Sequence, residues 1–165
     1  MSLQEELKMP NPFIYKSHEA MLNIVVTGTL LLREGAALLR PYGLTETHFN
    51  ILMLLKYQSE NGRINQTRLG NMLLIHRSNI TGIIDRMEKA GLVRRIADPE
   101  DRRINYIEMT EKGKETIEEA HKVYYNRLDE VMSVIADSDN DQICTKLDVI
   151  RKQLWDRNGE ENKSQ

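Results

Sequence analysis

Arginine and amide side chains are concentrated in two short stretches of the sequence. The first stretch holds Arg77 and Asn79, and the second ends in the adjacent pair Arg102 and Arg103. A guanidinium group donates two parallel hydrogen bonds to the edge of guanine, and an amide side chain pairs in the same way with adenine. Arginine also binds phosphate oxygens and enters narrow minor grooves, where the negative potential is enhanced. These residue types predict a nucleic-acid interface.

The first stretch opens a predicted helix over residues 76–90. Apolar residues recur there at helical spacing, and Gly91 stands where a left-handed residue commonly ends a helix. The apolar stripe consists of Ile80, Ile83, Ile84 and Met87. A shorter helix, capped by Asn65 and running to Leu73, precedes it. Two short helices with a tight joint predict a helix-turn-helix, whose second helix fits the major groove.

The second stretch is the tip of a predicted hairpin. Two β-rich runs, at 92–97 and 104–109, flank the charged sequence DPEDRR at 98–103. The hairpin lies beside the second helix, so arginines at its tip can enter a minor groove while Asp101 holds one of them in position. Arg94 and Arg95, on the first strand, are predicted to contact phosphates.

The predicted DNA contacts come from both elements. They are Arg77, Ser78, Asn79, Thr81, Arg86, Arg94, Arg95, Arg102 and Arg103, with Asp101 as the residue that orients an arginine.

Charge is divided unevenly along the chain. Residues 63–114 hold 11 Lys and Arg against 7 Asp and Glu, a net of +4, while the rest hold 12 against 18, which together give the formal net charge of −2. A basic segment inside an acidic chain suits local contact with a polyanion. The alternative is an ordinary solvated face.

Amphipathic helices flank this basic segment. The spacing of apolar residues predicts helices over 13–39 and 45–57, with Thr45 as an N-cap, and two more around residues 117–135 and 143–154. A monomer covers such stripes only in part, so a homodimer built from the terminal helices is expected. The alternative is that each helix packs on its own domain.

The predicted fold class is mainly α with a small β-hairpin wing, a winged helix-turn-helix with long terminal dimerisation helices. The expected division is a dimerisation region at 13–40 and 115–157, a DNA-binding domain at 44–114 and a disordered tail at 158–165. The tail is predicted from its polar composition.

Composition excludes several classes of protein. Apolar residues make up 40% of the 165 residues, and no uninterrupted apolar run approaches the roughly 18 residues of a membrane span. Residues 1–12 lack the pattern of a secretory signal, which favours a cytoplasmic location with no membrane partner. A single cysteine, Cys144, and four scattered histidines give no metal-site spacing.

Enzymatic signatures are also missing. The sequence contains no GxxxxGK[ST], GxSxG or HExxH motif, so neither catalysis nor a cofactor is expected. The alternative to DNA binding is a winged helix that contacts other proteins, for which a neutral second helix and an uncharged wing would be expected.

Three runs of this sequence resemble the MarR family of bacterial transcription regulators. They are LTETHFNIL at 44–52, SNITGIIDRMEKAGLVRR at 78–95, and DPEDRR at 98–103 followed by EMTEKG at 108–113. The resemblance covers about residues 20–155. Counting back from Thr110, it places Asp101 and Arg103 on the family's Asp-x-Arg wing pair and so favours Arg103 over Arg102 as the groove residue. Gly82 departs from the pattern, because many members carry a basic residue there.

The resemblance implies a homodimeric repressor that binds a palindromic operator and is released by a small anionic or phenolic ligand. In the family this ligand lies between the dimerisation helices and the DNA-binding lobe. Tyr15, Tyr42, His48 and Tyr57 are the candidate pocket residues, with core or interface packing as the alternative. Cysteine-based and zinc-based sensing are disfavoured, since Cys144 lies outside the first helix and His121 stands alone.

Overall fold

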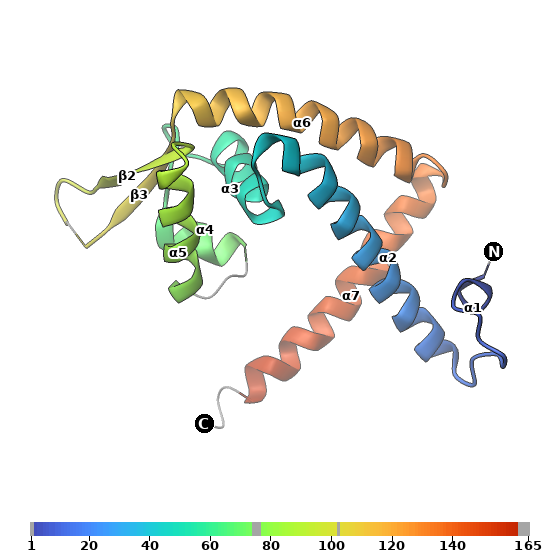
Figure 1. Ribbon diagram of the computed structural model, residues 1–165. Helices are drawn as coiled ribbons and strands as arrows, with labels where there is room; N and C mark the ends of the chain where they lie inside the picture. The colour runs from blue at the N-terminus through green and yellow to red at the C-terminus, as the bar shows by residue number, and fades with distance from the viewer. Residues whose placement is uncertain (1, 74–76, 102, 162–165) are drawn as a thin grey trace. The chain divides into compact units, whose positions relative to one another are not determined.

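The computed structural model describes residues 2–73, 77–101 and 103–161 (Figure 1). Arg102, which the sequence placed among the DNA contacts, lies outside the described residues. The chain divides into two units, Met1–Tyr124 and Tyr125–Gln165, and the division falls inside a long helix.

The first unit contains most of the secondary structure. A short helix α1 (Leu3–Glu6) precedes α2 (Lys16–Leu39), a 3₁₀ turn (Arg40–Tyr42) and α3 (Glu46–Tyr57). Strand β1 (Arg63–Asn65) leads into α4 (Gln66–Met72) and α5 (Arg77–Lys89), followed by β2 (Val93–Ala97), β3 (Asn105–Met109) and the first part of α6 (Glu111–Met132). This is the predicted winged helix-turn-helix.

The helix boundaries follow the local capping residues. The Thr45 hydroxyl accepts a hydrogen bond from the His48 N–H group at 3.2 Å, and the Asn65 side chain accepts from Thr67 and Arg68 at 2.9 and 3.1 Å. Both N-caps are confirmed. Gly91 has φ +72° and closes α5, as predicted from its position after the apolar stripe.

The sheet has three strands rather than the two of the predicted hairpin. Its order is β1-β3-β2 and every pairing is antiparallel, with Asn65 opposite Tyr106 on one side of β3 and Ile96 opposite Tyr106 on the other. The sequence did not predict β1, because three residues are too few to show an alternating pattern. The third strand, β1, pairs with β3 and so joins the wing to the start of α4.

The hydrophobic core lies within the first unit. Side chains from α2, α3, β1, α4, α5, β3 and α6 all contribute, and the stripe on α5 is buried as predicted. The largest fully buried side chains are Leu39, Ile51, Leu52, Leu55, Ile64, Leu69, Ile80, Ile84, Met87, Ile107, Ile117 and Val93. One core therefore fixes α5 against every other element of the winged helix.

The second unit holds the end of α6 and helix α7 (Asp137–Glu161). Helix α6 ends at Met132, a turn earlier than the apolar pattern predicted. Helix α7 runs to Glu161, and the last four residues of the predicted tail, 162–165, lie outside the described residues. Extending an existing helix costs little, and the glutamates at its end are good helix formers.

Helix α2 and the turn that follows it, Lys16–Tyr42, form a segment that is long and apolar enough by composition to cross a membrane. The segment contains no long uninterrupted apolar run, because polar residues interrupt it. Length and composition alone do not place a helix in a bilayer, since core helices of soluble proteins pass the same test. Many apolar side chains of α2 are nevertheless exposed, and burying them against another surface would be favourable.

Candidate nucleic-acid interface

Helix α5 has an inner and an outer face. Ile80, Ile84 and Met87 are completely buried, whereas Asn79 and Arg86 lie on the exposed side. Because the helix is clamped by its inner face, its outer face has a fixed orientation relative to the rest of the winged helix. Arg77 and Ser78 begin the helix, and their side chains lie outside the described residues.

A glycine lies in the middle of the outer face. Gly82 is one turn before Arg86, and a Cβ atom built on it would be 3.8 Å from the Arg86 Nη1 atom. Helical side chains lean toward the N-terminus of their helix and cover the preceding turn. The Arg86 guanidinium therefore lies next to the position where the family resemblance led us to expect a basic residue.

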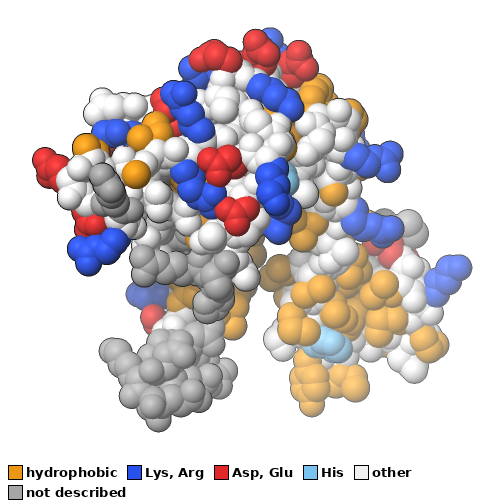
Figure 2. Space-filling model, turned by 60° about the vertical axis from the view of Figure 1, so that its left-hand side comes forward, with side chains coloured by type: hydrophobic (Ala, Val, Ile, Leu, Met, Phe, Trp, Pro, Cys, Tyr) orange, Lys and Arg blue, Asp and Glu red, His pale blue; other side chains and the backbone are white. Residues whose placement is uncertain are grey.

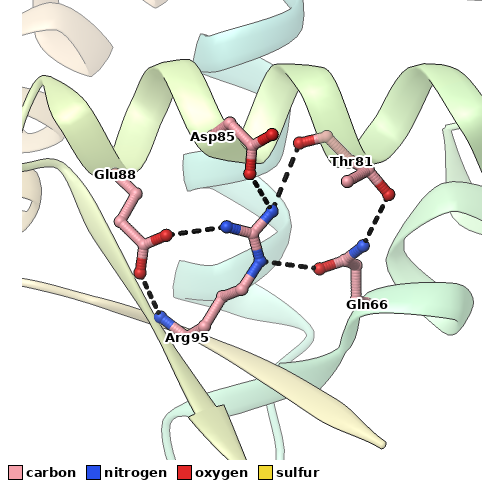
Figure 3. A network of polar contacts seen from close by, with 5 residues as sticks. All are labelled: Gln66, Thr81, Asp85, Glu88 and Arg95. Atoms are coloured by element: carbon pink, nitrogen blue, oxygen red, sulfur yellow. Dashed lines mark hydrogen bonds and ion pairs between the residues drawn. The ribbon is translucent and has the colours of Figure 1, made fainter. Parts of the chain in front are cut away.

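Arg95 is the centre of a polar network that joins three elements (Figure 3). From β2 its guanidinium reaches Asp85 Oδ1 at 2.6 Å and Glu88 Oε2 at 2.7 Å on α5, and it donates to Gln66 Oε1 on α4 at 3.1 Å. It also donates to the Thr81 carbonyl oxygen at 3.2 Å. Gln66 in turn donates to the Thr81 hydroxyl at 3.1 Å.

This network bears on Arg95 as a predicted phosphate contact. Every nitrogen of the Arg95 guanidinium already has a protein partner, and the side chain is only 22% exposed. Arg95 thus holds α4, α5 and β2 together instead of pointing into solvent. Arg94, its neighbour on the strand, points to the other side of the sheet, pairs with Glu108 at 2.8 Å and is 63% exposed.

At the wing tip, Asp101 grips Arg103 through two parallel hydrogen bonds. Arg103 Nε and Nη2 each lie 3.0 Å from one of the two carboxylate oxygens. The backbone N–H group of Arg103 also donates to Asp101 Oδ1, at 3.0 Å. This contact lowers the pKa of Asp101 and raises the pKa of Arg103. The Arg103 side chain is 90% exposed. The guanidinium is therefore both oriented and accessible.

A second aspartate shapes the turn itself. Asp98 accepts hydrogen bonds from the N–H groups of Glu100 at 2.8 Å and Asp101 at 3.1 Å, and these bonds lower the pKa of its carboxyl group. The Asp98 N–H group donates to the Ile104 carbonyl at 3.0 Å, which closes the hairpin. The side chain thus replaces the missing ladder contacts at the tip.

The wing and the helix-turn-helix border one small cavity of about 140 Å³. Its lining residues are Asn65, Gln66, Thr67, Ile80, Thr81, Arg103, Ile104 and Asn105. The wing arginine and the second turn of α5 are therefore neighbours across a polar cavity. Gln66 was not among the predicted site residues, because its partners are 15 and 29 residues away in the sequence.

Hydrogen bonds join the end of α5 to the start of α6. The Thr110 hydroxyl donates to the Gly91 carbonyl at 2.6 Å and accepts from the Gly113 N–H group at 3.0 Å. Lys112 Nζ donates to the Ala90 carbonyl at 2.7 Å. A Cβ atom on Gly113 would lie only 2.1 Å from the Leu92 carbonyl oxygen. Only glycine allows this close approach of the two backbones.

Comparison with known proteins agrees with this architecture. The model of the MarR family matches residues 44–104. The transcriptional regulator FarR of Neisseria gonorrhoeae is 31% identical over 122 residues, which are 73% of this chain and 82% of FarR. The chain belongs to the MarR family.

Other MarR relatives give the same result. The transcriptional repressor MprA of Escherichia coli K12 is 34% identical over 113 residues, which are 68% of this chain but only 64% of the repressor. AbsC, a MarR family regulator from Streptomyces coelicolor, superimposes with a TM-score of 0.78 at 25% identity and covers 87% of this chain and 98% of its own.

A solved structure with a bound ligand is also similar. CouR from Rhodococcus jostii RHA1, bound to p-coumaroyl-CoA, has a TM-score of 0.72 at 27% identity, with 84% of this chain and 95% of CouR covered.

The residues predicted to line an effector pocket lie in different surroundings in this MarR protein. Tyr15 precedes α2 and is exposed, and Tyr42 packs against the core. Tyr57 is exposed, and its hydroxyl lies 3.3 Å from His121 Nε2. A shared pocket for them stays a prediction.

A different cleft, of about 310 Å³, lies among α3, β3 and α6 and is lined by Leu55, Lys56, Ser59, Gly62, Glu108, Met109, Lys114, Ile117 and Glu118.

His48 is the most unusual of the four predicted pocket residues. Its Nδ1 atom is buried without a hydrogen-bond partner among the described residues. Burial lowers the pKa of the imidazole, and the nearby charge of Arg86 lowers it further. Two residues away, burial raises the pKa of Glu46, whose carboxylate is so close to Gly35 that a Cβ atom there would overlap it. Burial therefore shifts the protonation equilibrium of both groups toward the neutral form.

Hydrophobic side chains gather on part of the surface (Figure 2). On α2 the predicted stripe residues Met21, Val25 and Leu32 are all more than half exposed. On α7, Ile150 and Leu154 are about half exposed. Within one chain these stripes have no apolar cover among the residues that the structure describes.

Cysteine-based and zinc-based sensing each depend on specific side chains. Cys144 is exposed on α7. Within the described parts of the chain, no group of three or more His, Cys, Asp or Glu side chains is arranged to hold a metal ion.

Proposed function

We propose that this MarR protein is a sequence-specific double-stranded DNA-binding transcription regulator that acts as a homodimer in the cytoplasm, without catalytic activity. The observation that carries the proposal is the Asp101–Arg103 pair, which presents an exposed, oriented guanidinium beside the second turn of α5. An exposed arginine at a wing tip, next to a polar helix face, suits adjacent grooves of one duplex.

In this proposal α5 enters the major groove. Asn79 reads a base edge near the start of the helix, with Arg77, Ser78 and Thr81 contributing further base or phosphate contacts. Arg86 supplies a positive charge over Gly82, one turn later. The bare backbone at Gly82 also lets the helix approach the base edges closely.

The two arginines of β2 have separate roles. Arg94 is exposed and paired only at the surface, so it can exchange Glu108 for a phosphate. Arg95 acts as a positioning residue, since its hydrogen bonds fix α5 relative to β2 and α4. Arg103 enters the minor groove, and Arg102 adds charge next to it.

Two copies are required for tight binding. The exposed stripes of α2 and α7 supply the apolar area that a dimer interface needs. A two-fold axis then places two α5 helices in successive major grooves about 10 base pairs apart, which makes the operator an imperfect palindrome. Replacing Leu147 and Ile150 by Asp is expected to dissociate or unfold the protein, as measured by sedimentation. A stable wild-type monomer at micromolar concentration would contradict this part of the proposal.

We further infer that the regulator is a repressor released by a small anionic or phenolic ligand. MprA, one of its relatives, is a transcriptional repressor, and the similar structure of CouR holds p-coumaroyl-CoA. Tyr15, Tyr42, His48 and Tyr57 remain the candidate contacts for such a ligand.

Selection of bound sequences from random duplex DNA, with and without a panel of aromatic acids, tests the proposal. The expected product is a palindromic site whose affinity falls steeply with salt. For each tenfold rise in salt concentration, the logarithm of the binding constant should fall by about 0.9 for every phosphate that the protein neutralises. Inserting about five base pairs between the half-sites should abolish tight binding, because one half-site then faces the opposite side of the duplex. Unchanged affinity, or a flat salt response, would overturn it.

A further inference from the structure

Three side chains form a diagonal row across the sheet behind the wing. Arg63 on β1 is opposite Glu108, two residues from Tyr106 on β3, and Tyr106 is opposite Ile96, two residues before Asp98. Side chains two residues apart on a strand share a face, and diagonal neighbours on adjacent strands are within reach of long or aromatic side chains. Arg63, Tyr106 and Asp98 therefore lie on one face of the sheet.

Arg63 and Tyr106 are in direct contact, and both act on the carboxyl group of Asp98. The guanidinium carbon of Arg63 lies 4.7 Å from the centre of the Tyr106 ring, a cation–π distance. Backbone hydrogen bonds from Glu100 and Asp101 lower the pKa of Asp98 most, and the Tyr106 hydroxyl and the Arg63 charge lower it further. The aromatic ring thus lies between a strand outside the wing and the carboxylate that shapes the wing tip.

From Asp98 the contacts continue to the groove-binding arginine. Asp98 accepts from the Asp101 N–H group at 3.1 Å, and Asp101 holds the Arg103 guanidinium with two bonds of 3.0 Å. The ladder of β2 and β3 ends at the pair Ala97 and Asn105, so the tip extends beyond it. The side chains of the two aspartates tie the tip to the sheet together with the backbone hydrogen bonds that join Ile104 to Asp98 and Asp101.

We propose that Tyr106 and Arg63 are positioning residues for the wing, which set the direction of Arg103 through Asp98 and Asp101. Neither residue touches DNA in this proposal, which rests on the proposed DNA-binding function. Their effect on recognition is expected to act only through Arg103, and so only where the flanking minor groove is narrow.

A double-mutant cycle separates this role from a general structural one. Affinities are measured for wild type, Tyr106→Phe, Arg63→Gln and Arg103→Ala, and for each of the first two substitutions combined with Arg103→Ala. The probes are the tightest selected DNA site and the same site with G·C pairs in its flanks. Arg94→Gln is the matched control, because Arg94 lies on the same face of the sheet but pairs with Glu108.

Tyr106→Phe and Arg63→Gln are each expected to weaken binding to A·T-flanked DNA about two- to tenfold, and to have no effect once Arg103 is alanine. Arg94→Gln should weaken binding equally with and without Arg103. Losses that persist in the Arg103→Ala background, or that are the same for both flanks, would overturn the inference for that residue.

A readout without DNA distinguishes failure of this inference from failure of the proposed function. The Nε–H resonance of Arg103 in the free protein reports its contact with Asp101. Tyr106→Leu should shift or broaden that resonance while the amide spectrum of α5 stays unchanged. An unchanged Arg103 resonance overturns the inference even if the wild type binds DNA, whereas a wild type that binds no duplex overturns the proposed function itself.

Discussion

Helix α5 and the wing both present polar groups to solvent, but they are held in very different ways. Helix α5 is fixed by a buried apolar stripe, by the Arg95 network and by the fastening of its end to α6. The wing tip depends on exposed polar contacts that follow one another, from Asp98 to Asp101 to Arg103. Substitutions in the contacts that hold α5 in place should therefore cost stability, whereas substitutions at the wing tip should change recognition alone.

The largest effect is expected at the joint between α5 and α6. Gly113→Ala places a Cβ atom 2.1 Å from the Leu92 carbonyl oxygen, and a backbone atom moves aside only at high cost. Unfolding free energy should fall by about 3 kcal/mol or more, at the upper end for overpacking. Thermal denaturation measures this loss.

Gly82→Ala is the matched control for this substitution, because its new Cβ would meet only the Arg86 guanidinium, at 3.8 Å. Helix propensity then predicts a gain of up to about 1 kcal/mol. A Gly113→Ala protein as stable as wild type would mean that the joint is not tight.

The next largest effect separates the two neighbouring arginines of β2. Arg95→Gln removes two ion pairs and leaves the Asp85 and Glu88 carboxylates without a cationic partner, so stability should fall by about 1 to 2 kcal/mol. Arg94→Gln should change stability by no more than about 0.5 kcal/mol, since its partner is at the surface. Chemical denaturation of both variants measures the difference. Equal losses would show that the Arg95 network does not anchor α5.

Arg86 and Gly82 allow a compensation experiment on the outer face of α5. Arg86→Ala should weaken DNA binding by about 1 to 3 kcal/mol, the usual range for one base contact. Gly82→Arg in the same variant should restore part of this loss, because the new guanidinium enters the same space. Fluorescence anisotropy with the selected site measures both steps. Further loss in the double variant would place Arg86 away from DNA.

The smallest effect concerns pH. Burial holds the pKa of His48 below its ordinary value near 6.5, so the unfolded chain binds the proton more readily than the folded one. Stability should therefore be at its full value above pH 6.5 and decline as the pH falls below it. His48→Gln should remove this decline, which denaturation at several pH values detects. A decline of the same size in the variant would assign it to another group.

The wing should not share this pH dependence. Hydrogen bonds lower the pKa values of both Asp98 and Asp101, so the two carboxylates stay charged until the pH falls below the ordinary aspartate value. The Arg103 resonance should be constant between pH 5 and 8.

Sequence patterns predicted the parts of the site that depend on neighbours in the chain. The caps Thr45 and Asn65, the C-terminal Gly91 and the Asp101–Arg103 pair are all local, and the structure has each of them. Strand β1 and the role of Arg95 depend on partners far along the chain, which a single sequence does not reveal.

One signal for Arg95 was nevertheless present. Side chains alternate along a strand, so Arg94 and Arg95 must point to opposite faces, and Arg95 shares its face with the position of buried Val93. Alternation therefore predicts that Arg95 points inward. It does not identify Gln66, Asp85 and Glu88 as the partners, because that depends on how α4 and α5 pack.

The central claim is that α5 reads base edges while the wing reads groove width. The most direct test measures Asn79→Ala and Arg103→Ala against four duplexes that combine a correct or altered half-site with A·T or G·C flanks. Asn79→Ala should lose discrimination between half-sites and keep the preference for A·T flanks, and Arg103→Ala should show the reverse. Loss of both preferences in both variants, or of neither, would contradict the account.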